Sequence, residues 1–174
     1  MRRGRWVGAG LLLAGLIALG LGGRPLLLSG LTTIIRLQFP AVRWISSAAL
    51  LRWQDRTDSA APLLLDVRTE SEFTISHLPG ARRLEPGAPL PPDLLTLPRT
   101  TPIVTYCAVS YRSAVAAEAL EAAGFSDVQN LEGSIFRWAN EGHPLVAEGR
   151  PVREVHGFGS PWRFLLNPDR RAVR

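Results

Sequence analysis

Residues 103–120 read IVTYCAVSYRSAVAAEAL and place the only cysteine of the chain, Cys107, between a strand-like run and a helix-like run. The first part is short, apolar and rich in β-branched residues, which is typical of a buried strand. From Tyr111 onward, small apolar residues recur at helical spacing and predict a helix that ends at Gly124. The turn between these two elements therefore presents a thiol, helix-start N–H groups and Arg112 at the end of a strand.

Two further segments predict strands. APLLLDVRT, residues 61–69, is a continuous apolar run closed by Asp66, as expected for a parallel strand that is buried on both faces. DVQNL, residues 127–131, predicts a third strand. The carboxyl ends of parallel strands are where chemistry gathers in such sheets, and Asp66 and Cys107 both lie at such ends.

Three further helices are predicted before, between and after these strands. Residues 46–55 begin with a capping serine, either Ser46 or Ser47, and residues 69–77 begin with a capping box formed by Thr69 and Glu72. We interpret Glu72 as part of a solvated helix start. GSIFRWANEG, residues 133–142, predicts a third helix. Alternating strands and helices indicate an α/β fold, a parallel sheet flanked by helices.

The proline-rich stretch LPGARRLEPGAPLPPDLLTLPRTTP, residues 78–102, fits a long surface connection better than a packed element. The C-terminal stretch after residue 147 is rich in glycine, proline and arginine, and we expect it to wrap the domain or to fray. The sequence thus divides into an apolar segment at 1–30, a connector at 31–43, an α/β domain at 44–147 and an arginine-rich extension at 148–174.

The N-terminal segment is long and apolar. Eighteen uncharged residues, Trp6 to Gly23, follow Arg2, Arg3 and Arg5. As a helix they would measure roughly 27 Å, close to the hydrocarbon thickness of about 30 Å of a bilayer. A retained single-pass membrane anchor is the favoured interpretation, because the run is longer than the usual apolar core of a signal peptide. A signal peptide that is cleaved before export is the alternative.

The charge distribution argues against a nucleic-acid partner. All twenty basic residues are arginines, and the formal charge is +7 before Asp55, −6 from Asp55 to Gly149 and +4 thereafter. The net charge of +5 is thus the sum of two basic ends and an acidic body, with no basic domain surface. The histidines show no paired ligand spacing, so no metal site is predicted.

Two interpretations of Cys107 follow from the residues alone. Free N–H groups and the positive end of a helix favour an anion at this turn, so a thiolate there would be stabilised and nucleophilic. Arg112 adds a fixed positive charge, and the N–H donors of its planar guanidinium are arranged to bind an oxyanion. The alternative is a small buried thiol that only fills space.

About 100 residues of the chain resemble the rhodanese, or thiosulfate sulfurtransferase, domain. The resemblance is carried by WISSAALLRW (44–53), PLLLDVRTESEFTISHLPGARRL (62–84), PIVTYCAVSYRSAVAAEALEAAGF (102–125) and VQNLEGSIFRWANEGHPLV (128–146). It implies a three-layer α/β fold with a short central parallel sheet. The chain departs from the family pattern at Glu132 and Gly133, where two glycines are common, and at Ser110, where many single-domain members have glycine.

The resemblance implies a sulfurtransferase mechanism that needs no cofactor. Cys107 would take the outer sulfur of a small donor such as thiosulfate, hold it as a persulfide and pass it to a thiol, cyanide or a protein acceptor. The resemblance also implies that the active-site loop forms a cradle around the persulfide. The residues of this loop are Ala108, Val109, Ser110, Tyr111 and Arg112. The same resemblance implies that Asp66 and Arg68 support the loop from the neighbouring strand.

Cysteine-dependent phosphatases and arsenate reductases are less favoured. Phosphatases of this fold resemble it in the Cys-to-Arg cradle but place five residues between the cysteine and the arginine. This chain has four, Ala108 to Tyr111, and Ser113 stands where a phosphatase would have arginine. A different alternative is a binding or scaffolding module at a membrane that keeps the fold without turnover.

Overall fold

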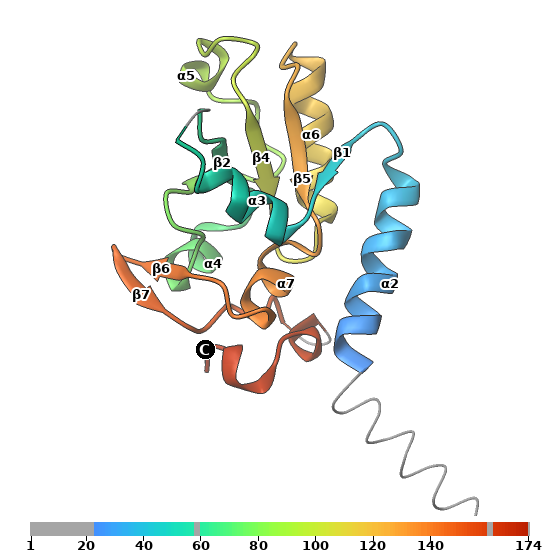
Figure 1. Cartoon of the computed structure of the whole chain (residues 1–174), viewed down its shortest axis with the longest axis vertical. Coiled ribbons are helices and arrows are strands. Elements are labelled where there is room, and N and C mark those ends of the chain that lie inside the picture. The colour runs from blue at the N-terminus through green and yellow to red at the C-terminus, as the bar shows by residue number, and fades with distance from the viewer. Residues whose placement is uncertain (1–22, 58–59, 160–161, 174) are drawn as a thin grey trace, which may run out of the picture.

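The computed structural model describes residues 23–57, 60–159 and 162–173 (Figure 1). Its centre is a five-stranded sheet in the order β1-β5-β4-β2-β3, with every neighbouring pair parallel. The strands are short: β1 (Arg43–Ile45), β2 (Leu63–Asp66), β3 (Arg82–Arg83), β4 (Ile103–Tyr106) and β5 (Val128–Leu131). The predicted α/β fold with a short central parallel sheet is confirmed.

The helices are α2 (Gly23–Gln38), α3 (Ser47–Gln54), α4 (Glu70–Ile75), α5 (Pro92–Leu95), α6 (Tyr111–Ala122) and α7 (Ser134–Asn140). Local signals explain where two of them begin. The Ser46 hydroxyl accepts a hydrogen bond from the Ala49 N–H at 3.2 Å and caps α3, and Thr69 and Glu72 form the predicted capping box of α4.

Strand alternation divides the core between the two faces of the sheet. Leu64 and Val104 point to one face, where they pack with residues of α3 and α7. Leu65 and Ile103 point to the other face, against the small side chains of α6. All four side chains are at least 97 % buried, as expected for parallel strands covered by helices on both faces.

The connection at residues 78–102 contains packed structure that the sequence does not predict. Arg82–Arg83 form the edge strand β3, in register with Leu65 and Asp66 of β2. The single turn of α5 inserts Leu94, which is buried, into the core on the α6 side. The expectation of a connection without packed elements is therefore wrong. The buried Leu94 and the two residue pairs between β3 and β2 are enough to hold this turn-rich segment against the domain.

Helix α2 crosses the boundary that the sequence suggests at residue 30, and it packs on the domain along its length (Figure 1). Leu28 belongs to one core cluster and Ile35 to the other. Of the expected connector at 31–43, residues 31–38 form the second half of this helix, and Arg43 begins β1. Of the predicted membrane segment, residues 1–22 lie outside the described residues. Within the described ranges, no helix has both the length and the apolar character needed to cross a bilayer.

The C-terminal segment wraps the domain, one of the two outcomes expected for it. Its first strand, β7 (Arg150–Val152), pairs antiparallel with β6 (Leu145–Ala147) just before it, and the segment ends in two 3-10 turns, η2 (Trp162–Leu165) and η3 (Pro168–Arg170). Val155 and Leu166 are fully buried. Figure 1 shows this segment beside α7, near the carboxyl ends of the central strands.

Candidate active site

The cysteine loop connects β4 to α6 at the carboxyl end of the sheet. Cys107 follows the last residue of β4, and α6 begins at Tyr111. The residue before the helix, Ser110, has a left-handed backbone conformation (φ 82°), which turns the chain sharply from strand to helix. This conformation is uncommon for a residue with a Cβ, so neighbouring contacts must hold it in place.

Two serines and an asparagine hold the loop. The Ser110 hydroxyl donates to the Leu131 carbonyl at 2.9 Å, and the Ser134 hydroxyl accepts from the Cys107 N–H at 3.1 Å. The Asn130 side-chain amide donates to the Ser110 carbonyl at 2.9 Å. All three of these side chains are buried, so their hydrogen bonds fix the loop without competition from water.

The backbone carbonyl groups at the start of the loop point toward α7. The N–H groups of Ile135 and Phe136 at the start of α7 donate to the carbonyls of Cys107 and Ala108 at 3.1 and 3.2 Å. Within a trans peptide the C=O and the N–H point in opposite directions, so the N–H groups of Ala108 and Val109 point away from α7. Among the described residues, the N–H groups of residues 108–112 have no hydrogen-bond acceptor. They are available to an anion.

Arg112 is held by an acid to which the sequence gives only a role at a helix start. Its guanidinium donates two parallel hydrogen bonds to the Glu72 carboxylate, at 2.9 and 2.8 Å, and lies 4.4 Å from the ring centroid of Phe158. Glu72 is 2 % exposed, so its interpretation as part of a solvated helix start is wrong. The partners lie 40 positions apart, and no local pattern joins them. The capping box is the sequence signal that could have pointed to this role, because it turns the Glu72 carboxylate toward the protein interior.

The charges of this pair stabilise each other. Burial raises the pKa of Glu72, but its hydrogen bond and charge interaction with Arg112, together with hydrogen bonds from Thr69, outweigh burial and leave the pKa lowered. Burial lowers the pKa of Arg112, whereas Glu72 and the nearby Cys107 raise it, and the net direction is upward. Arg112 is therefore a permanent cation beside the cysteine, with one carboxylate already bound.

Cys107 is 1 % exposed and lines a partly open, largely apolar cavity of about 370 Å³. Ala108, Val109, Tyr111 and Arg112 of the loop also line it. The remaining walls are Leu31, Ile34, Ile35 and Gln38 of α2 together with Phe158 and Trp162 of the C-terminal segment. The thiol is thus buried, but it borders a space large enough for a small molecule.

Asp66 and Arg68 form a fully buried ion pair at the end of β2, with hydrogen bonds of 2.8 and 2.6 Å. Arg68 also donates to the Ser76 carbonyl at 2.6 Å, so the pair fixes the end of α4. Their side-chain hydrogen bonds join the two residues to each other and to Ser76 rather than to the cysteine loop. They reach it through the sheet, because Asp66 pairs with Tyr106, the residue before Cys107.

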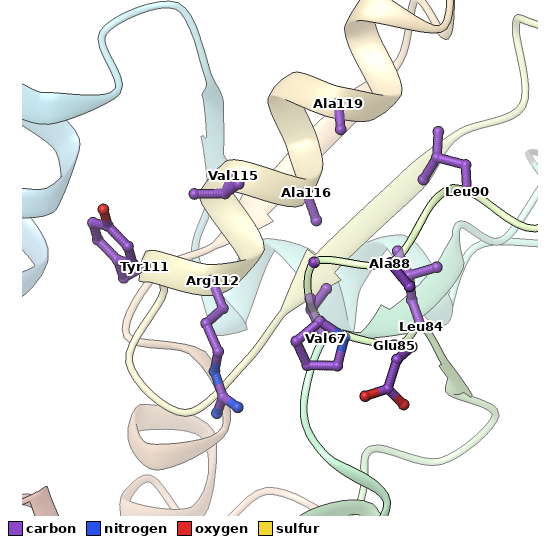
Figure 2. Close-up of a pocket in the computed structure, with 12 residues that line it drawn as sticks. Val67, Leu84, Glu85, Ala88, Leu90, Tyr111, Arg112, Val115, Ala116 and Ala119 are labelled. Carbon is purple, nitrogen blue, oxygen red and sulfur yellow. The ribbon is translucent and has the colours of Figure 1, made fainter.

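A second cavity, of about 320 Å³, shares Tyr111 and Arg112 with the first (Figure 2). In Figure 2, Val67, Leu84 and Leu90 lie across from Ala116 and Ala119 of α6. Cys107 does not line this cavity, so we assign the chemistry to the first one.

The histidine of the turn after α4 has structural contacts. The His77 ring stacks on Phe73 with centroids 3.8 Å apart, and its main chain pairs with Val146 in β6. In the part of the chain that the structure describes, no three His, Cys, Asp or Glu side chains gather closely enough to bind a metal ion.

Comparisons with known proteins agree with this architecture. A family model described as rhodanese-like domain matches residues 47–141, more than half of the chain. A protein named sulfurtransferase from Allochromatium vinosum is 35% identical over 94 residues, which cover 54% of this chain and 87% of that protein. The probable adenylyltransferase/sulfurtransferase MoeZ of Mycobacterium tuberculosis is 38% identical over 93 residues, but these are 52% of this chain and only 24% of that protein.

A solved structure shares the fold. The crystal structure of a rhodanese-like domain protein from Staphylococcus aureus is 28% identical, with a TM-score of 0.52 over 62% of this chain and 99% of that one. The match of the family model over β2, the cysteine loop and α7, together with the parallel sheet that joins them, shows that the chain belongs to the rhodanese-like domain family.

Proposed function

We propose that the protein is a sulfurtransferase that carries a sulfane sulfur as a persulfide on Cys107. The observation that supports this proposal most strongly is the loop itself, in which a thiol beside Arg112 is followed by N–H groups that have no acceptor among the described residues. Such a cup stabilises the thiolate before the reaction and the persulfide anion after it. The names of the sulfurtransferase relatives favour the same chemistry.

Each residue of the site has its own role in the proposed sulfur transfer. The Cys107 thiolate attacks the outer sulfur of a donor, and the N–H groups of residues 108–112 hold the anionic sulfur that results. Arg112 supplies a fixed positive charge, and Glu72 holds its guanidinium in position. Asp66 and Arg68 keep the end of β2 in place next to β4. Since Cys107 is the only cysteine, the sulfur must leave to an external thiol, cyanide or a partner protein.

A sulfur-transfer assay on the full chain tests the proposal. With thiosulfate or methanethiosulfonate as donor and cyanide as acceptor, the wild-type protein should produce thiocyanate, and Cys107→Ser should reduce the rate to the uncatalysed level. Glu118→Gln, on the exposed side of α6, is the control and should retain the wild-type rate. Equal rates for the wild type and Cys107→Ser would refute the proposal and would favour a binding module without turnover.

We further propose that the apolar stretch before α2 attaches the domain to a membrane. Its length and lack of charge support this proposal, as do the exposed leucines 26, 27 and 37 of α2. The full chain should sediment with membranes and be released by detergent but not by salt, whereas a chain that begins at Gly23 should stay in the supernatant. A purified protein whose mass lacks the first residues would instead indicate a cleaved signal peptide.

A further inference from the structure

The cavity over Cys107 is bordered by parts of the chain that lie outside the matched family segment. The family model covers residues 47–141, whereas two of the walls come from α2 (Gly23–Gln38) and from the C-terminal segment that carries Phe158 and Trp162. The space in front of the thiol is therefore shaped by additions that belong to this chain.

These added walls are almost entirely apolar. Leu31, Ile34 and Ile35 face the cavity from α2, and the two aromatic rings face it from the other side; Gln38 is the polar side chain that these segments contribute. The charge of Arg112 is balanced by Glu72, and one face of its guanidinium is covered by Phe158. A small inorganic dianion such as thiosulfate would meet little uncompensated positive charge and would leave most of the cavity empty.

The wall that α2 provides is a fixed part of the fold. In the first turn of α2, Arg24 donates a hydrogen bond to the Phe164 carbonyl at 3.1 Å. Near the middle of the helix, the Ser29 hydroxyl accepts a hydrogen bond from Arg137 at 3.1 Å. At the far end, Arg36 pairs with Glu132 at 2.6 Å. Just beyond the helix, Phe39 contacts the Tyr111 ring edge-on at 5.4 Å between centroids. A site that is shaped before its ligand arrives selects by complementarity.

We propose that the sulfur compound that reacts with Cys107 carries an apolar organic group, which binds between α2 and Phe158 while its terminal sulfur reaches the thiolate. This inference rests on the proposed sulfurtransferase function and adds the class of substrate. Ile34, 57 % exposed, and Phe158, 39 % exposed, both reach the surface, so the organic group enters between them.

The step is a sulfur transfer without net oxidation. The Cys107 thiolate attacks the outer sulfur of an organic thiosulfonate, R–SO2–S⁻. A new S–S bond forms at Cys107, the bond between the sulfonyl sulfur and the outer sulfur breaks, and its electron pair leaves with the sulfinate, R–SO2⁻. Cyanide then takes the outer sulfur of the persulfide as thiocyanate and regenerates the thiolate.

A homologous series of donors tests the proposal on the full chain. Methane-, ethane-, propane- and butanethiosulfonate anions differ in apolar area but hardly in the sulfinate leaving group. With cyanide as acceptor, we expect kcat/KM to rise about fourfold for each added methylene group, because each one is removed from water in the cavity. We expect thiosulfate to be the poorest donor. The rates of the same donors with free cysteine correct for intrinsic reactivity.

Two matched variants of α2 locate the effect. Ile34→Asn places a polar group in the cavity wall and should flatten the dependence on chain length. Leu26→Asn makes a similar change on the same helix, at a residue that is 74 % exposed and does not line the cavity, and should leave the dependence unchanged. Transfer from every donor with no dependence on chain length would overturn the inference and leave the sulfurtransferase function standing. No transfer from any donor would overturn both.

Discussion

The ion pair between Glu72 and Arg112 controls the charge of the cysteine site. Glu72 is buried and accepts hydrogen bonds from Thr69 as well as from Arg112, so four donor contacts converge on one carboxylate. Arg112 in turn is fixed beside Cys107 and under the Phe158 ring. A buried carboxylate thus determines where the cation beside Cys107 lies and how much of its charge is left unbalanced.

Glu72→Gln should lower the free energy of unfolding by about 2 kcal/mol at neutral pH, because it leaves the partly buried Arg112 without its counter-ion. The pKa of Glu72 is lowered in the folded protein below the value of about 4.3 for an unfolded chain. The contribution of the ion pair is therefore complete above that value and is lost as the pH falls through the folded pKa. Urea unfolding of both proteins between pH 7 and pH 3 measures this difference.

The exposed neighbour Glu70 provides the control for this measurement. Glu70→Gln removes the same charge from the same helix turn, and it should change stability by less than about 0.5 kcal/mol at any pH. A Glu72→Gln effect that stayed constant down to pH 3 would contradict the role of the charge.

Ser110 combines backbone strain with a buried hydrogen bond. Ser110→Ala loses the bond to the Leu131 carbonyl but keeps the left-handed conformation with a Cβ, whereas Ser110→Gly loses the bond and relieves the strain. We expect the glycine variant to be more stable than the alanine variant by about 1 kcal/mol. Thermal or urea unfolding of the two variants measures the difference, and an alanine variant as stable as the glycine variant would show that the backbone is unstrained.

At the scale of single elements, helix α2 has two distinct faces. One face carries Leu28 and Ile35, which are nearly fully buried in the two core clusters. The opposite face exposes Leu26 and Leu37, at 74 and 77 %. The helix is therefore bound as part of the core, and its outer apolar surface is left for the membrane contact proposed above.

Leu28→Ala should destabilise the protein by about 3 kcal/mol, because it removes a buried side chain and leaves a cavity between α2 and the core. Leu26→Ala deletes the same atoms from the exposed face and should change stability by less than about 0.5 kcal/mol. Denaturant unfolding of the two variants compares them directly. Equal effects would mean that α2 is not held against the domain as described.

The sequence predicts best the elements that carry strong local signals. The apolar runs of β2 and β4, the serine cap of α3 and the capping box of α4 were all recognisable from a few adjacent residues. The edge strands β1 and β3 were missed, since two or three residues carry too little periodicity and their pairing depends on distant partners. The same limit applies to the Glu72–Arg112 pair, which forms only when α4 and α6 meet.

At the scale of the whole molecule, the N-terminal and C-terminal segments pack on the rhodanese-like domain and border its cysteine loop. The matched segment supplies the sheet, the cysteine loop and the ion pair at Arg112, and the two additions supply the walls over the thiol. The sequence boundaries at residues 44 and 147 enclose the first part only. A functional test of this protein therefore needs α2 and the C-terminal segment as well as the domain between them.

The most direct test of the account is the mass of the peptide that contains Cys107. The full chain is incubated with methanethiosulfonate, and excess donor is removed before digestion. The account predicts that this peptide gains the mass of one sulfur atom, that cyanide removes it, and that Cys107→Ser shows no gain. An unchanged wild-type peptide, in a reaction where free glutathione is converted to its persulfide, would contradict the account.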